Sequence, residues 1–194
     1  RRDRLSDVLA GLAAAADAGF DPIKLNAVVM RGVNDDEVVD LVRFAVRHGY
    51  QMRFIEQMPL DAGHTWDRGQ MVDQAEILAR LRGAFRLTPL DGRGAAPAEL
   101  WLVDDGPATV GVIASVTAPF CASCDRLRLT ADGQLRSCLF ARTETDVRAV
   151  LRSGAVDSAI EAALHECLAG KKAGHGIGEP GFVQPERPMS AIGR

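Results

Sequence analysis

Three cysteines in the second half of the chain have the spacing of metal ligands. Cys121 and Cys124 form a C-x-x-C pair, and Cys138 follows after a short strand-like segment. A C-x-x-C pair places two sulfurs on one turn, and Asp132-Gly133 predicts a hairpin that returns Cys138 to their side, opposite Arg126 or its neighbour. Three thiolates suit soft metals, so the pattern predicts either a zinc site or an iron–sulfur cluster.

The choice between zinc and an iron–sulfur cluster depends on a fourth ligand. A structural zinc site needs four ligands, and the nearest downstream candidates are His165, Cys167 and His175. Cys167 falls on an apolar helical stripe, which favours a core position, and His165 lies beside that stripe. Without a fourth ligand the metal keeps an open position, as reactive centres do. A redox dithiol or plain buried cysteines are the other interpretations.

Cationic residues occur beside the cysteines and inside two apolar strands. Arg126 and Arg128 are two apart in a predicted strand and therefore share one face, with Leu127 on the other. Two guanidinium groups beside a metal suit an anionic or phosphate-bearing ligand, and the alternative is a solvated polar face. Lys24 and Arg53 interrupt apolar strands, which indicates a ligand cavity unless their charged ends reach the surface.

Helices and strands alternate in the first half of the chain, which predicts an α/β fold. Strands are expected at about 23–30 and 51–57, and helices at about 4–18, 34–48 and 70–82. Asn34 and Glu37 are expected to form a capping box at the start of the second helix. The order predicts parallel strands with right-handed crossovers. Two such strands cannot form a covered sheet alone, so this half is expected to end a larger α/β unit.

The second half has a different organisation. Short strands are expected near 99–103 and 109–115, then the cysteine hairpin, then helices near 144–153 and 157–169. The tail from Gly170 onward is rich in glycine and proline, which predicts an irregular segment. A loop at 92–98 separates the halves, so the expected domains are residues 1–98 and 99–194.

The composition indicates a globular protein without an obvious polyanionic partner. The chain has 194 residues, is 47% hydrophobic and 25% charged, and carries a formal net charge of -3. This balance argues against nucleic acid or an anionic membrane as a partner. No apolar run reaches the roughly 18–20 residues of a membrane span, and no signal peptide is recognisable. A cytoplasmic location is expected, where cysteines serve as metal ligands more often than in disulfides.

Taken together, these segments resemble the C-terminal part of the radical S-adenosylmethionine GTP cyclases of molybdenum cofactor biosynthesis, the protein A family. The cysteine–arginine module is the most specific of the matches, and the order of all five segments supports it. The five are Ile23–Asn26, Arg31–Asp35, Arg53–Pro59, Cys121–Cys138 and Met189–Gly193. The resemblance favours iron–sulfur over zinc. It implies the end of a partial TIM-like (β/α) barrel, followed by an iron–sulfur-binding C-terminal extension.

The resemblance also implies roles for individual residues. Cys121, Cys124 and Cys138 would hold a 4Fe–4S cluster whose iron without a cysteine ligand contacts GTP. The GTP contacts implied are Lys24, Arg53, Arg126, Leu127 and Arg128. Met58 would lie beside S-adenosylmethionine. In that family a second 4Fe–4S cluster cleaves S-adenosylmethionine, and the resulting radical starts the cyclisation of GTP to 3',8-cyclo-7,8-dihydro-GTP.

Two departures from the family pattern bear on activity. The chain has no C-x-x-x-C-x-x-C motif, which in the family binds the S-adenosylmethionine cluster, so the chain alone is expected to be inactive. The family usually ends in a glycine pair that reaches the active site, whereas here Gly193 is followed by Arg194. The competing interpretation is a noncatalytic zinc- or cluster-binding module, a truncated or degenerate remnant. Whether two copies form a homodimer stays open.

Overall fold

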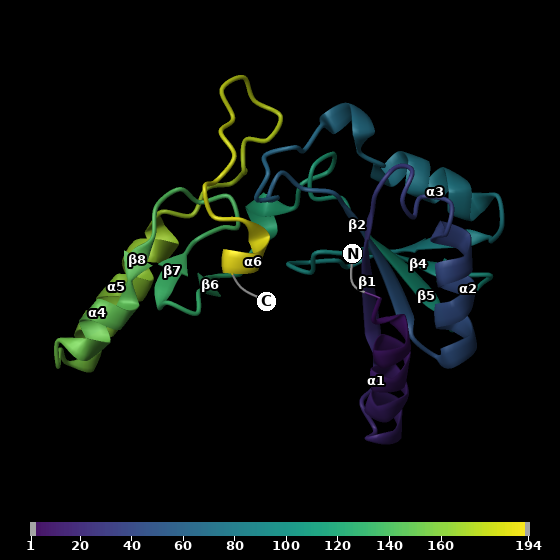
Figure 1. The fold of residues 1–194 in the computed structure, drawn as a ribbon, viewed down its shortest axis with the longest axis horizontal. Coiled ribbons are helices and arrows are strands. Elements are labelled where there is room, and N and C mark those ends of the chain that lie inside the picture. Colours follow the sequence, from purple (N-terminus) through teal and green to yellow (C-terminus); the bar gives the residue numbers. More distant parts are fainter. Residues whose placement is uncertain (1–2, 193–194) are drawn as a thin grey trace. The chain divides into compact units, whose positions relative to one another are not determined.

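The computed structural model describes residues 3–192, which form two compact units (Figure 1). The first unit contains the residues up to Glu56 together with Met71–Arg93 and Ala98–Ala114. The second contains Gln57–Gln70, Gly94–Pro97 and the residues from Ser115 onward. Each unit has its own sheet.

The first unit is built on a five-stranded mixed sheet, so the expected α/β class is confirmed. Its strands lie in the order β1 (Lys24–Val29), β2 (Gln51–Glu56), β5 (Thr109–Ile113), β4 (Glu99–Val103) and β3 (Leu87–Leu90). The expected parallel pairing of β1 with β2 is confirmed, and β2 also pairs in parallel with β5. Strands β5, β4 and β3 pair antiparallel. The helices of this unit are α1 (Leu5–Asp17), α2 (Val38–His48) and α3 (Gln74–Arg82).

One face of this sheet and the apolar stripes of α2 and α3 form the core. Phe54 from β2 and Val112 from β5 are completely buried, as is Ile77 from α3. Figure 1 shows α2 and α3 together at one side of the sheet. Helix α2 ends at Gly49, whose φ of 71° provides the left-handed cap that terminates many helices. This packing fixes the positions of β2 and β5, whose opposite face carries Arg53 and Gly111.

The opposite face of the sheet is polar where β1 and β2 meet. Asn26 lies opposite Arg53, and Arg53 lies opposite Gly111. Lys24 is two residues before Asn26 and so points to the same face. Lys24 and Asn26 are exposed. Cations from two neighbouring strands therefore share one face.

The expected capping box at the start of α2 is wrong. The helix begins at Val38, after Glu37, and no side chain caps it. The Asn34 side chain accepts a hydrogen bond from the Met30 backbone N–H at 2.8 Å and donates to the Val28 carbonyl at 3.0 Å. The amide of Asn34 therefore stabilises the turn after β1. Its hydrogen-bond partners are backbone groups of this turn and not those of the helix N-terminus.

The division of the chain into compact units differs from the division expected at residue 98. That position lies between β3 and β4, which pair with each other, and β5 pairs with β2. Residues Ala98–Ala114 therefore belong to the first unit. Sequence order suggested a boundary at a glycine- and proline-containing loop, whereas strand pairing joins the segments on its two sides.

An ion-pair network ties the turn after β1 to α3. Glu76 accepts hydrogen bonds from Arg31 at 2.6 Å and from Arg80 at 2.7 Å. Arg80 also pairs with Asp35 at 2.9 Å. The network joins segments that are far apart in sequence, which stabilises the loop that follows β1.

Acidification is expected to weaken this network as Glu76 takes up a proton. Hydrogen bonds from Arg31 and Arg80 lower the pKa of Glu76 to about 2, from an ordinary value of 4.5. A carboxyl group with a lower pKa in the folded state stabilises the fold above its unfolded pKa, and this contribution is lost as the pH falls toward 2. Since the side chain is 31% exposed, solvent screening limits the loss to about 1–2 kcal/mol.

Urea unfolding at about pH 6 and about pH 3 measures this loss. Glu76→Gln cannot titrate, so its free energy of unfolding should depend less on pH than that of the unmodified chain. The same pH dependence in both proteins would contradict a role for Glu76.

The second unit contains a small sheet and a helical pair. The expected hairpin and both expected helices are confirmed. The strands are β6 (Arg128–Leu129), β7 (Gln134–Arg136) and β8 (Thr145–Asp146), and the helices are α4 (Val147–Arg152), α5 (Asp157–Ala169) and α6 (Met189–Ile192). Short 3-10 turns occur at Arg68–Gln70 and Cys121–Ser123. As expected, the segment after Gly170 is largely irregular.

Charged side chains hold the C-terminal segment against the hairpin of the second unit. Arg187 donates to Asp132 at 2.8 Å and to Glu144 at 2.9 Å. Glu144 also pairs with Arg136, whose side chain is only 2% exposed. A buried charge is costly unless it is paired, so this network fixes the segment near Arg187 to the sheet.

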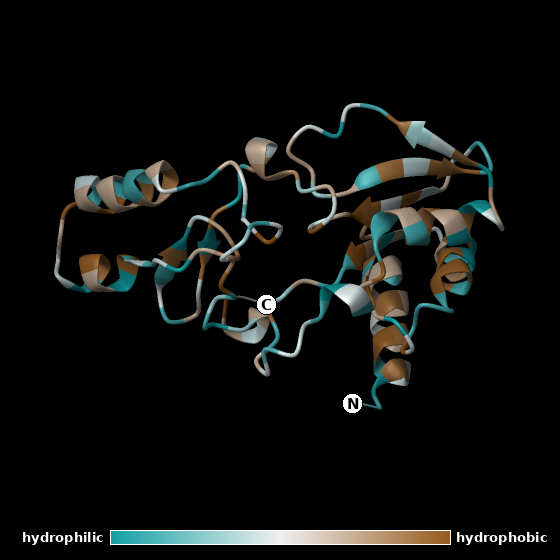
Figure 2. Cartoon of the chain, turned by 90° about the horizontal axis from the view of Figure 1, so that it is seen from above, coloured by the Kyte–Doolittle hydropathy of each residue, from teal (hydrophilic) through white to brown (hydrophobic). Residues whose placement is uncertain are grey.

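Helix α1 has apolar residues that the rest of the described chain does not cover. Figure 2 shows α1 coloured largely as hydrophobic, yet none of its residues is buried. Leu5 is 67% exposed and Val8 is 56% exposed. Within residues 3–192 no helix is long and apolar enough to cross a membrane.

Candidate metal centre

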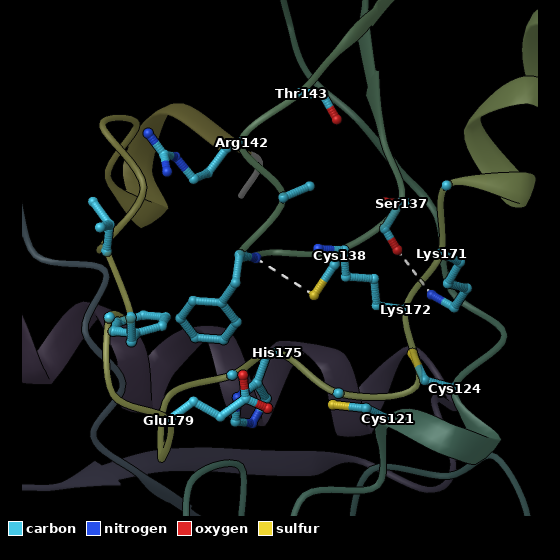
Figure 3. Close-up of a pocket in the computed structure, with 18 of the residues that line it drawn as sticks. Cys121, Cys124, Ser137, Cys138, Arg142, Thr143, Lys171, Lys172, His175 and Glu179 are labelled. Carbon is cyan, nitrogen blue, oxygen red and sulfur yellow. Dashed lines mark hydrogen bonds between the residues drawn. The ribbon is translucent and has the colours of Figure 1, made fainter.

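The three cysteines line one cavity of the second unit (Figure 3). The cavity has a volume of about 620 Å³. Cys121 begins the 3-10 turn and Cys124 directly follows it, while Cys138 comes two residues after the end of β7. The loop from Lys171 to Val183 completes the wall.

The hairpin brings Cys138 back toward the C-x-x-C pair, as the sequence predicted. Arg128 lies opposite Arg136 in the β6–β7 pairing. The same register, continued by two residues, sets Arg126 opposite Cys138. The turn depends on Gly133, which has a φ of 81° and whose added Cβ would lie 2.5 Å from the Arg148 Cβ.

Two of the cysteine sulfurs accept hydrogen bonds from N–H donors. The Arg126 guanidinium donates to the Cys124 sulfur at 3.5 Å, and the Phe140 backbone N–H donates to the Cys138 sulfur at 3.4 Å. The backbone of His175 favours ionisation of Cys121 by lowering the pKa of its thiol, although burial outweighs this effect. Donors of this kind favour the thiolate form, which is the form that binds metals.

The ionisation of Cys121 and Cys124 reflects their surroundings. Burial raises the pKa of the Cys121 thiol, and the neighbouring Cys138 raises it further. Burial also opposes ionisation of Cys124, but hydrogen bonds from Arg126 outweigh burial and lower the pKa of that thiol. The mutual effect of the thiols shows that they are electrostatic neighbours, and such neighbours lose their protons together when a cation binds.

Of the three candidate fourth ligands, only His175 is among the residues that line the cavity. His165 is on α5 with its side chain 74% exposed, and Cys167 belongs to a buried apolar cluster, as expected. His175 lines the cavity, but its Nε2 donates to the Ser115 carbonyl at 2.6 Å and its Nδ1 accepts from the Ile177 N–H at 3.1 Å. Both ring nitrogens of His175 are therefore engaged.

The arrangement of the thiols can be compared with the needs of a single ion and of a cluster. Within residues 3–192, no group of three or more His, Cys, Asp or Glu side chains could hold one metal ion. A cluster distributes its thiolate ligands over several metal atoms, so its ligands lie further apart than those of one ion. Three thiols around one cavity, two of them with N–H donors, are compatible with a cluster held by three thiolates.

Two arginines lie beside the thiols in the second unit. The Arg126 guanidinium covers the Phe120 ring at 4.9 Å while it contacts Cys124. Burial lowers the pKa of Arg128, and the positive charge of Arg126 lowers it further. The two positive charges repel each other in this half-buried site, so a bound anion would stabilise the charged form of both side chains. Leu127 packs against the apolar cluster around Leu135.

The other predicted cations belong to the first unit. The Arg53 Nε is buried and has no hydrogen-bond partner among the described residues. Burial lowers the pKa of Arg53. Its side-chain stem crosses Gly111, where an added Cβ would lie 3.0 Å from the Arg53 Cγ. Lys24 is exposed on the same face of the sheet.

The segment that carries Met58 belongs to the second unit and contacts the C-terminal segment. Met58 is half-buried. The Met189 backbone N–H donates to the Leu60 carbonyl at 2.9 Å, and Gln184 donates to the Asp61 carbonyl at 2.8 Å. Gly193, a candidate for a catalytic role, lies outside the described residues.

Sequence reasoning missed two features of the site. Lys171 was not singled out, although its ammonium group contacts the backbone on both sides of the cysteine hairpin. His175 was considered only as a ligand, whereas it holds the cavity wall. The sequence signal was Lys171–His175, which matches a family segment that more commonly has Lys-Pro, and that difference by itself indicates no role for Lys171.

Comparison with known proteins gives one family. Residues 50–177 match the model of the family described as Molybdenum Cofactor Synthesis C. This match agrees with the resemblance found from the sequence segments alone.

Curated relatives match the entire chain. A protein named GTP 3',8-cyclase from Mycobacterium sp. (strain KMS) is 61% identical over 194 residues, which are 100% of this chain and 55% of the relative. The protein of that name from Streptomyces coelicolor (strain ATCC BAA-471 / A3(2) / M145) is also 61% identical, with 57% of its length covered. GTP 3',8-cyclase 2 from Mycobacterium tuberculosis (strain ATCC 25618 / H37Rv) is 60% identical, with 55% covered. The chain spans about half the length of these relatives.

Proposed function

Because the chain belongs to the Molybdenum Cofactor Synthesis C family, we propose that it forms the substrate-binding part of a GTP 3',8-cyclase. In this proposal Cys121, Cys124 and Cys138 hold a 4Fe–4S cluster, and GTP is the substrate. The complete activity requires S-adenosylmethionine and a second cluster, for which this chain has no C-x-x-x-C-x-x-C motif.

One observation carries the proposal. Three thiols line a single cavity, and of the three candidate fourth ligands two do not line it and the third, His175, has both ring nitrogens engaged. A cluster held by three thiolates has one iron without a protein ligand. When bound, such a cluster supplies a Lewis-acidic iron that can take a donor atom of the substrate.

Positively charged side chains are available to bind the phosphates and the polar edge of the base of GTP. Arg126 and Arg128 are a half-buried cationic pair beside the thiols, so they suit the polar edge of a purine or a phosphate. Lys24 and Arg53 share one face of the first unit's sheet, where the buried Arg53 Nε lacks a partner. A triphosphate would satisfy that donor and offset the cost of its burial.

These residues bind and orient, and the radical chemistry is supplied by cofactors. Holding the ribose and the guanine of one nucleotide in a fixed mutual orientation favours bond formation between them, since the reacting atoms are already close. In this proposal the cluster and the two arginines bind the base, while the resemblance assigns phosphate contacts to Lys24 and Arg53 and an S-adenosylmethionine contact to Met58.

Equilibrium binding of GTP to cluster-loaded and metal-free chain tests the proposal. We expect GTP to bind the loaded chain at least about tenfold more tightly, because the open iron adds a contact worth about 1.4 kcal/mol or more. ATP should bind the loaded chain less tightly than GTP does. Equal affinity of GTP for the two forms would overturn the proposed role of the cluster in substrate binding.

A further inference from the structure

The segment directly after α5 contacts the backbone on both sides of the cysteine hairpin. The Lys171 ammonium group donates to the Arg126 carbonyl at 2.9 Å and to the Ser137 carbonyl at 2.8 Å. Figure 3 shows the second of these bonds as a dashed line beside Cys138. Arg126 follows Cys124 by two residues and Ser137 precedes Cys138. One ammonium group therefore fixes the separation of the two chain segments that carry Cys124 and Cys138.

The same segment reaches the side of the cavity that carries the third thiol through His175. The backbone of His175 acts on Cys121 by lowering the pKa of its thiol, against the larger effect of burial. The His175 ring donates to the carbonyl of Ser115, in the segment that leads to Cys121. The ring also contacts the Phe140 ring, with 5.2 Å between the centroids, and the Phe140 N–H donates to the Cys138 sulfur. His175 thus connects the Cys121 side of the cavity to the Cys138 side.

We propose that residues 171–175 form a strap, anchored by Lys171 and His175, that holds the three thiols in place and tunes the reduction potential of the cluster. Neither residue is a ligand, and both act through others, so they are positioning residues. The inference rests on the proposed assignment of the cluster to Cys121, Cys124 and Cys138.

The charge of the strap gives it an electronic as well as a geometric role. The Lys171 ammonium is an electrostatic neighbour of the Cys121 and Cys124 thiols. Reduction adds an electron to the cluster, so a nearby positive charge stabilises the reduced form. Removing that charge should make the midpoint potential more negative, which a loss of packing alone would not do.

Lys171→Met and Arg152→Met form a matched pair for the test. Each removes one positive charge from the second unit, but Lys171 lines the cavity, whereas Arg152 is exposed on α4 and does not line it. The measurements are the midpoint potential, by redox titration followed by EPR, and the rate of iron release to a chelator. In Lys171→Met we expect a more negative potential and iron release about tenfold to 100-fold faster, the usual effect of losing an outer-shell partner. In Arg152→Met we expect both values to be unchanged.

The same potential and release rate in both variants would overturn the strap. If Lys171→Met does not fold by circular dichroism, His175→Ala decides, with the exposed His165→Ala as its control. Faster iron release in His175→Ala alone supports the strap, and equal rates in the two histidine variants overturn it. A failure of the proposed function is recognised separately, because the unmodified chain would then bind no cluster.

Discussion

Cys124→Ala is expected to leave the chain without its cluster. The Cys124 sulfur accepts a hydrogen bond from the Arg126 guanidinium at 3.5 Å. Hydrogen bonds from Arg126 lower the pKa of the Cys124 thiol, although burial opposes this effect. Two remaining thiols cannot replace the third, because no further Cys or His donor is directed at them in the described chain. Iron content after anaerobic reconstitution should fall from about four per chain to near zero.

Cys167→Ala is the matched control for that loss. Cys167 is 6% exposed and packs in the apolar cluster with Leu135 and Val147, so its removal creates a small cavity. We expect a cost of about 1 kcal/mol in stability and an unchanged iron content. Full iron content in Cys124→Ala, or its loss in Cys167→Ala, would show that the ligands are assigned to the wrong cysteines.

Arg126→Ala is expected to weaken GTP binding while the cluster remains. Loss of a charge-assisted contact to the substrate costs about 1.5–3 kcal/mol, which corresponds to roughly tenfold to 100-fold in affinity. The cluster should remain because all three thiols are still present. GTP affinity by calorimetry and iron content on the same sample separate the two effects.

Arg152→Ala controls for a general change in charge. Arg152 is exposed in the last turn of α4. Its removal should leave GTP affinity unchanged. Unchanged affinity in Arg126→Ala, or a loss of iron in that variant, would contradict the role in substrate binding given to Arg126.

The sequence predicted the parts of the fold that depend on local pattern. The parallel β1–β2 pair follows from two apolar runs separated by an amphipathic helix. The cysteine hairpin follows from the Asp132-Gly133 turn, because only glycine readily adopts the φ of 81° found at Gly133. Cys167 was predicted to be a core residue from its helical stripe, and it is buried.

Long-range pairing was not predictable in the same way. No local sequence pattern indicates that β5 pairs with β2, because β3 and β4 lie between these two strands in the sequence. Residues 99–114 were therefore expected in the other domain. The Asn34 side chain forms hydrogen bonds within a turn and does not cap α2. A short polar side chain can do either, so the sequence alone does not decide between a turn and a helix cap. The contacts of Lys171 with two distant carbonyls depend on the tertiary fold and have no sequence signature.

The most direct test of the central claim is the iron, sulfide and zinc content of the anaerobically reconstituted 194-residue chain, with EPR spectra before and after addition of GTP. The account predicts about four irons and four sulfides per chain and an EPR signal that GTP changes, because the substrate binds an iron without a cysteine ligand. About one zinc per chain, no iron and no response to GTP would indicate a structural metal site and contradict the cyclase assignment.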